Sequence, residues 1–147
     1  MKHKKLILLL IILGIFMSAN IVCAVDYSSL KNPKDFKTFD KNGVSEKDTD
    51  GRVKLTVVPI NDNTIKYITG NGEKNNDNIY KYVDFGYSAK DDKFGYEGYT
   101  EVVDIDGEQY VVSVLFDSKM SPSEEKEFLD VLTEFNKLNN LKPVAVE

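Results

Sequence analysis

The sequence YEGYTEVVDIDGEQYVVSVLF, residues 96–116, predicts the centre of the fold. Asp106-Gly107 divides the segment in two, and this dipeptide suits the left-handed positions of a tight two-residue turn. The arm after the turn, 110–116, is apolar at nearly every position, which is typical of a central strand covered on at least one face. We therefore expect an antiparallel hairpin. The turn predicts two opposed pairs, Val103 with Tyr110 and Val102 with Val111.

Two segments before the hairpin also have the alternation of strands. Residues 53–60, VKLTVVPI, alternate apolar and polar side chains until Pro59, which lacks an N–H donor and marks a strand end or a sheet edge. After a polar turn, residues 64–69 are expected to form the partner strand. Residues 79–87 alternate again, with Lys81 interrupting the apolar set. These segments extend the hairpin into a larger sheet.

The segment after the hairpin predicts a helix. Ser121, Pro122 and Glu124 form the pattern of a capping box with proline in the first turn, and Asn139-Asn140 ends the helix. A lone helix of this length is marginal in water, so it should lie on the sheet. The predicted fold class is α+β: an antiparallel sheet of four to five strands with a C-terminal helix packed on one face. The expected buried stripe is Phe128, Val131, Leu132, Phe135 and Leu138.

The first 24 residues have the layout of a secretory signal. Three lysines form a basic end, residues 6–17 are a short apolar core, and small residues follow up to Ala24. Cleavage is expected between Ala24 and Val25. An uncleaved membrane anchor is the alternative, because residues 6–25 are about long enough to span a bilayer. Both outcomes place the rest of the chain outside the cytoplasm, secreted or tethered to the outer face of the cell membrane.

The sequence therefore predicts three parts: the leader 1–24, a polar segment and loop 25–52, and an α+β domain 53–147. In the polar segment, Phe36 and Phe39 are the expected anchors. Asn32-Pro33 starts either a short helix through Phe39 or an extended run. Residues 41–52 are charged and punctuated by glycine, and we expect a loop there.

Composition excludes several classes of function. The chain has a net charge of −5, and because three of its 19 basic residues but none of its 24 acidic ones lie in the leader, the part after residue 24 carries about −8. Such a charge repels nucleic acid and anionic membranes. The only histidine and cysteine, His3 and Cys23, belong to the leader. A histidine triad, a cysteine nucleophile, a His/Cys zinc site and a disulfide are therefore excluded from the exported part, and no cofactor is expected.

An acidic loop offers a candidate cation site. Glu46, Asp48 and Asp50 alternate before Gly51, as oxygen ligands do at the start of a calcium loop. The twelfth position, where an EF-hand has a bidentate glutamate, is Val57. We interpret the segment as a solvated loop and keep calcium binding as an alternative.

Tyrosines in the sheet region are a second candidate site. Exposed tyrosine rings can stack on sugars or anchor a protein partner, whereas tyrosine is also a favoured strand residue that packs its ring. Packing is the main interpretation, and a binding face is the alternative. The residues concerned are Tyr80, Tyr82, Tyr96, Tyr99 and Tyr110.

Two carboxylates are the third candidate. Glu97 and Glu101 are four residues apart on one predicted strand, so they share a face. A pair of carboxylates can hydrolyse a glycosidic bond where a cleft holds them apart. A domain of this size has little room for a cleft, and a small carboxylate-based hydrolase is the lesser alternative.

The tail EFNKLNNLKPVAV, residues 134–146, together with the leader and the Lys/Asn/Asp/Ile-rich composition, is similar to small exported proteins of unknown function from methanogenic archaea. The resemblance implies an extracytoplasmic site and no assigned activity. The sequence thus predicts an exported, non-catalytic domain at the cell envelope that acts by binding or structural association. Its expected partner is an envelope or extracellular protein or glycan, not nucleic acid. It contacts the membrane only through its N-terminal segment, if that segment is uncleaved.

Overall fold

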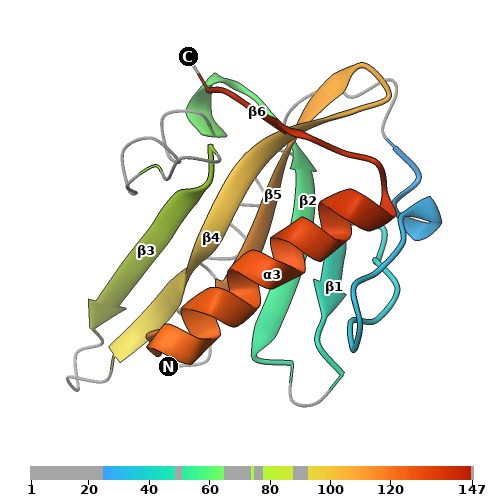
Figure 1. The fold of residues 1–147 in the computed structure, drawn as a ribbon. Helices are drawn as coiled ribbons and strands as arrows, with labels where there is room; N and C mark the ends of the chain where they lie inside the picture. Colours follow the sequence, from blue (N-terminus) through green and yellow to red (C-terminus); the bar gives the residue numbers. More distant parts are fainter. Residues whose placement is uncertain (1–24, 49–50, 65–73, 75–77, 88–92, 147) are drawn as a thin grey trace.

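A computed structural model of the chain describes residues 25–48, 51–64, 74, 78–87 and 93–146 (Figure 1). Within these residues, one antiparallel sheet is crossed on one face by a single long helix. The elements in chain order are the 3-10 helix η1 (Tyr27–Ser29), β1 (Val44–Glu46), β2 (Val53–Pro59), β3 (Tyr80–Tyr87), β4 (Lys93–Ile105), β5 (Glu108–Phe116), α3 (Pro122–Leu138) and β6 (Pro143–Val144).

The sheet has β5 at its centre. Its order is β1-β2-β5-β4-β3, and β6 pairs with β4 beyond the end of β3. Strand β2 ends at Pro59, as the missing donor predicts. The α+β class, the antiparallel sheet and the C-terminal helix are confirmed. The described sheet is six-stranded rather than four- or five-stranded, because β1 and β6 were not predicted.

The β4–β5 hairpin forms as its turn sequence requires. Asp106 and Gly107 both have positive φ, 54° and 87°, which is the left-handed conformation that aspartate and glycine tolerate best. The Gly107 N–H donates to Asp104 Oδ1 at 2.9 Å and closes the turn. Both predicted cross-strand pairs are present, Val103 with Tyr110 and Val102 with Val111.

Helix α3 begins with the predicted capping box. The Ser121 hydroxyl accepts a hydrogen bond from the Glu124 N–H, and the Glu124 carboxylate accepts one from the Ser121 N–H. Asn139 caps the other end, and Asn140 adopts a positive φ of 54°. These local interactions satisfy backbone groups that a helix leaves unpaired at its ends.

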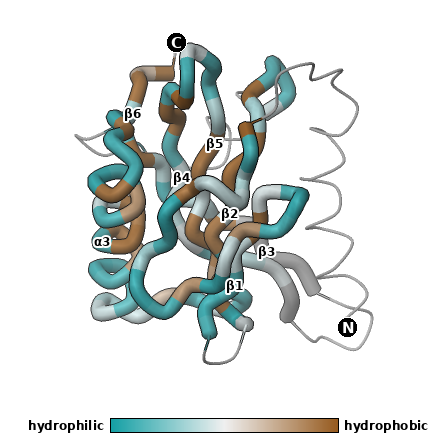
Figure 2. The backbone as a smooth tube through the Cα atoms, turned by 90° about the vertical axis from the view of Figure 1, so that its right-hand side faces the viewer, coloured by the Kyte–Doolittle hydropathy of each residue, from teal (hydrophilic) through white to brown (hydrophobic). Residues whose placement is uncertain are grey.

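The main core lies between α3 and the sheet. Figure 2 shows α3 on one side of the sheet, with hydrophobic residues concentrated in the central strands. Phe128, Leu132 and Phe135 are buried as predicted, whereas Val131 and Leu138 are only half-buried. The rings of Phe135 and Phe128 meet Phe39 and Phe116 edge to face, with centroids 5.8 and 5.5 Å apart. The expected anchors Phe36 and Phe39 both belong to this core.

The opposite face of the sheet is also buried. It holds two smaller apolar clusters, and Ile60, Val144 and Val146 pack against the first of them. The members of the first are Val58, Tyr80, Val102 and Val111, and those of the second are Tyr82, Tyr96 and Leu115.

Two local predictions were wrong, and one open alternative is decided. Residues 41–52 are not entirely loop, because Val44–Glu46 pairs with β2. Of the two alternatives after Asn32-Pro33, the helix is not formed; the chain makes a turn and then a β-bridge from Phe36 to Lys47. Asp62 to Thr64 are helical, which contradicts a strand beginning at Thr64, and residues 65–69 of that predicted strand lie outside the described part.

The leader, residues 1–24, also lies outside the described part of the chain. In the residues that the structure does describe, no helix combines the length and the apolar character needed to cross a bilayer.

Candidate functional site

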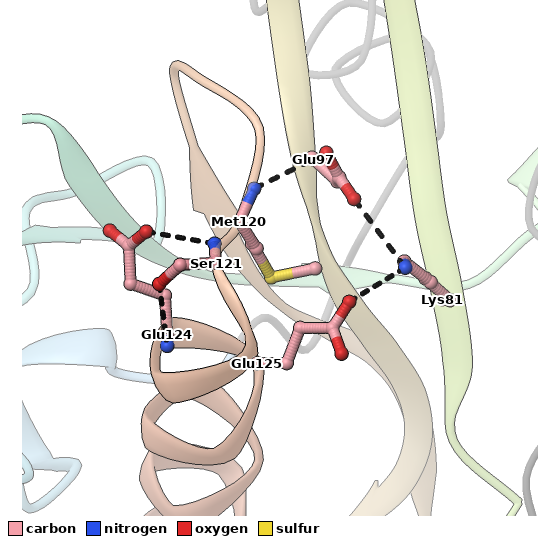
Figure 3. Close-up of polar contacts among 6 residues, drawn as sticks. All are labelled: Lys81, Glu97, Met120, Ser121, Glu124 and Glu125. Atoms are coloured by element: carbon pink, nitrogen blue, oxygen red, sulfur yellow. Dashed lines mark hydrogen bonds and ion pairs between the residues drawn. The ribbon is translucent and has the colours of Figure 1, made fainter.

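A polar cluster joins edge strand β3 to the start of α3 (Figure 3). Lys81 is on β3 and points to the face covered by α3, where the alternation of strand residues places it opposite Tyr99 of β4. Its Nζ is 2.8 Å from Glu125 Oε1 on the helix and 3.5 Å from Glu97 Oε1 on β4. One lysine therefore bridges three elements.

The electrostatics of the cluster favour charged Lys81. The hydrogen bond to Glu125, followed in importance by the charges of Glu125 and Glu97, raises the pKa of Lys81 although partial burial opposes the shift. Burial and the Glu125 carboxylate also raise the pKa of Tyr99, the cross-strand neighbour of Lys81. The lysine is thus a fixed cation and the phenol stays neutral, an arrangement that supports packing rather than proton transfer.

Glu97 is held from a second side as well. Its Oε2 accepts a hydrogen bond from the Met120 N–H at 3.3 Å, immediately before the capping residue Ser121 (Figure 3). This contact ties β4 to the turn that starts α3. The Glu97 carboxylate therefore has donors on both oxygens, and the residue is buried.

Glu101 is the more deeply buried of the two candidate carboxylates. It has no exposed surface, and its Oε1 accepts a hydrogen bond of 2.5 Å from Asn136 Nδ2 on α3. Asn136 is itself buried and was not expected in the apolar stripe. A buried carboxylate needs such a donor, since leaving it without one costs several kcal/mol.

The sequence correctly placed Glu97 and Glu101 on one face of one strand. That face is the one that α3 covers, so the two side chains point into packed protein. A glycosidase needs carboxylates that border a cleft open to the sugar. The geometry gives both residues structural partners, and it does not favour the hydrolase alternative.

The five candidate tyrosines divide between the two faces of the sheet. Tyr99 and Tyr110 lie on the α3 side, where the Tyr110 hydroxyl accepts a hydrogen bond from the Val25 N–H at 3.1 Å. Tyr80, Tyr82 and Tyr96 belong to the clusters of the opposite face. All five are buried, so they do not form one exposed platform, and their arrangement favours the packing interpretation.

Burial and the charge of Asp117 raise the pKa of Tyr96, so this phenol stays neutral in the folded protein.

The acidic loop is only partly described. Glu46 Oε1 is 3.8 Å from Lys54 Nζ, and the Asp48 N–H donates to the Asp35 carbonyl. Asp50 lies outside the described residues. In the part of the chain that is described, no three acidic, histidine or cysteine side chains are grouped so as to hold a metal ion.

A hollow of about 370 Å³ lies between α3 and residues 34–47, and no sequence pattern predicted it. Lys47 crosses it to Glu127, with Nζ and Oε1 2.5 Å apart. The two sides of the hollow are formed by segments about 80 residues apart in the sequence, which the fold brings together. Its charged lining residues are Lys34, Asp35, Lys47, Lys126, Glu127, Asp130 and Glu134.

Comparison with known proteins gives no family for the chain: no protein-family model, no curated protein and no solved structure matches it.

Proposed function

We propose that the chain is an exported protein whose part after residue 24 acts at the cell envelope by non-catalytic binding or structural association. The observation that carries the proposal is the leader, in which three lysines precede the apolar run 6–17 and small residues lead to Ala24. This layout directs a chain across a membrane, with the lysines held on the cytoplasmic side.

The chemistry of the exported part supports a non-catalytic role. It contains no histidine or cysteine. Its two best-placed carboxylates, Glu97 and Glu101, are buried and bind Lys81, the Met120 N–H and Asn136. These contacts join elements of the fold, and both carboxylates are buried. Binding is therefore the class of activity that the side chains favour.

Export is tested by expressing the full chain in an exporting host and determining the N-terminal residue and the cell fraction of the product. The expected product begins at Val25 and lies outside the cytoplasm. Leu9→Arg interrupts the apolar run and should leave the precursor in the cytosol, whereas Lys4→Arg keeps the basic end and should be exported normally. Intact wild-type precursor among the soluble cytosolic proteins contradicts the proposal.

The binding role is tested by incubating the processed protein with envelope fractions and recovering the complex. We expect an envelope protein or glycan to be retained reproducibly. Turnover of an envelope polymer without any retained partner contradicts the binding role, and unchanged turnover in Glu97→Gln and Glu101→Gln variants would remove the carboxylate hydrolase.

Calcium binding at Glu46, Asp48 and Asp50 is the alternative with a direct assay. A ligand that binds only the folded protein raises the melting temperature. Because Glu46 is already near Lys54, we expect millimolar calcium to leave the melting temperature unchanged. A rise that is lost in Asp48→Asn would instead support the cation site.

A further inference from the structure

Val25 is attached to the core through its own backbone nitrogen. The Val25 N–H donates to the Tyr110 hydroxyl at 3.1 Å, and the Val25 side chain packs against the core between the sheet and α3. Tyr110 lies on β5, the central strand, and is only 1% exposed. The position at which the leader is expected to be cut is therefore also a position at which the chain is held by a buried polar group.

The surroundings of this nitrogen are acidic. A hollow of about 360 Å³ beside Val25 and Tyr110 is lined by the carboxylates of Asp26, Asp106 and Glu108 and by no basic side chain of the described residues. A second hollow, of about 380 Å³, also borders Val25 and adds Asp40 and Lys41. The groups that face Val25 from η1, from the β4–β5 turn and from the loop before β1 thus carry a net negative charge. A peptide N–H has no net charge, so it gains less from these acidic groups than an ammonium group would.

We propose that the structure contains a binding site for an ammonium group, and that its occupant is the α-ammonium of Val25 produced by removal of the leader. Water adds across the Ala24–Val25 peptide bond: Ala24 leaves with the carboxylate, and the nitrogen of Val25 takes up protons to become the ammonium. This inference rests on the proposed export and cleavage. The new cation keeps its hydrogen bond to the Tyr110 hydroxyl and gains the attraction of Asp26, Asp106 and Glu108.

The Tyr27 hydroxyl beside the site remains neutral. Burial, together with the neighbouring Tyr110, raises the pKa of Tyr27 to about 12. A hydrogen bond whose donor is charged is roughly twice as strong as one between neutral groups. Processing therefore converts a neutral contact into a charge-assisted one at the same buried oxygen, and the mature N-terminus becomes part of the folded structure.

The sign of the pH dependence follows from the acidic surroundings. Carboxylates favour the charged amine and burial disfavours it; because acidic groups outnumber the basic one here, we expect the folded pKa of the α-amine to lie above its ordinary value of about 7.7–8.0. The stabilisation is fully present below that ordinary value and is lost as pH rises through the raised folded pKa. Lys41 opposes the shift, and Asp26, Asp40, Asp106 and Glu108 outnumber it.

The test uses the full chain, expressed with its leader in an exporting host, and the processed product. Competitive acetylation between pH 6 and 9 measures the pKa of the Val25 amine, because only the unprotonated amine reacts. Exposed Lys119 is the internal reference. We expect an amine pKa about one unit above its ordinary value, which makes Val25 roughly fivefold less reactive at pH 8, and roughly tenfold less reactive at pH 6, than in the urea-unfolded protein. A pKa at or below the ordinary value overturns the inference.

Variants locate the site. Tyr110→Phe removes the accepting hydroxyl and should return the Val25 amine toward its ordinary reactivity, whereas Tyr27→Phe, whose hydroxyl does not bind the Val25 N–H, should not. If Tyr110→Phe does not fold, Asp106→Asn with Glu108→Gln removes two exposed charges and should lower the pKa of the amine. Unchanged reactivity in these variants contradicts the inference.

The proposed export and the proposed ammonium site are contradicted by different results. A product that begins at Val25 but has an amine of ordinary pKa retains export and removes the ammonium site. A product that is never cut, or is cut elsewhere, removes both.

Discussion

On the face that α3 covers, β4 buries two carboxylates, Glu97 and Glu101, whereas on the opposite face the same strand buries Tyr96, Thr100 and Val102. The described residues of the opposite face bury no charged side chain. Its buried polar groups are neutral, such as the Ser113 and Thr100 hydroxyls, which are hydrogen-bonded to each other at 2.9 Å. The strands are the same, so the difference lies in what packs on them.

Helix α3 and the turn before it supply the donors. Met120 offers a backbone N–H to Glu97, and Asn136 offers an amide N–H to Glu101. Neighbouring hydroxyls on adjacent strands can satisfy each other without any covering element. The buried carboxylates on this face therefore depend on α3 and the turn before it for hydrogen-bond donors. The following variants measure how much each contact of α3 contributes to stability.

The largest expected effect comes from the apolar contact of α3 with the sheet. Leu132→Ala on α3 should lower the free energy of unfolding by about 3–5 kcal/mol, the usual cost of a cavity at a fully buried leucine. Leu115→Ala makes the same chemical change on the opposite face, where the other described members of its cluster are Tyr82 and Tyr96, and should cost less. Urea denaturation measures the free energy of unfolding of both variants. Equal losses of stability would contradict the larger contribution that we expect from the α3 face.

A second, smaller effect is expected at the buried carboxylate. Asn136→Leu removes the donor to Glu101 and should cost about 1–3 kcal/mol, because a fully buried acceptor then lacks that hydrogen bond. The double variant with Glu101→Leu should cost less than the sum of the single changes. On the opposite face, the neutral pair Ser113→Ala and Thr100→Val should show a coupling energy nearer 1 kcal/mol. Strict additivity at Glu101 and Asn136 is the result that contradicts the interaction.

The start of α3 contributes less again. Ser121→Ala removes the capping hydroxyl and should destabilise the protein by about 1 kcal/mol. Ser123→Ala is the matched comparison: its hydroxyl lies 3.0 Å from the Ser121 hydroxyl but does not accept the Glu124 N–H, so this change should cost less than Ser121→Ala. Thermal unfolding of the two variants distinguishes them, and a loss of the same size at Ser123 would show that the cap itself is not responsible.

The smallest effect concerns Lys81, at the edge of the covered face. Its side chain is 38% exposed, so solvent screens its ion pairs and Lys81→Met should cost less than about 0.5 kcal/mol. Because the folded pKa of Lys81 is raised above 10.5, the contribution is present below that value and lost as pH rises through the raised pKa. Melting curves of wild type and variant should therefore converge above pH 10.5, and a difference that persists there would point to packing instead.

The hairpin and the helix could be predicted from the sequence because their signals are local. Asp106-Gly107 defines its turn within two residues, and Ser121 with Glu124 defines the helix start within four. Strands β1 and β6 gave no comparable signal. Each has only two or three residues, and what makes it a strand is the edge of β2 or β4 beside it.

The candidate sites also depend on contacts between elements, which local sequence patterns do not show. That Glu97 and Glu101 share a face follows from strand periodicity, and the structure agrees. That they are buried depends on Met120, Lys81 and Asn136, which lie on other elements. Strand periodicity alone separates Tyr96 from Tyr99 on β4. The faces of Tyr80, Tyr82 and Tyr110 follow only once the pairing of β3 and β5 with β4 is known.

The sheet order has a consequence for how the chain is made. A polypeptide emerges with its N-terminus first, yet the inner edge of β2 pairs only with β5, which is separated from it by β3 and β4. Closing so long a loop is slow compared with forming local contacts. Strand β2 therefore has no partner at its inner edge until the chain has been made as far as Phe116.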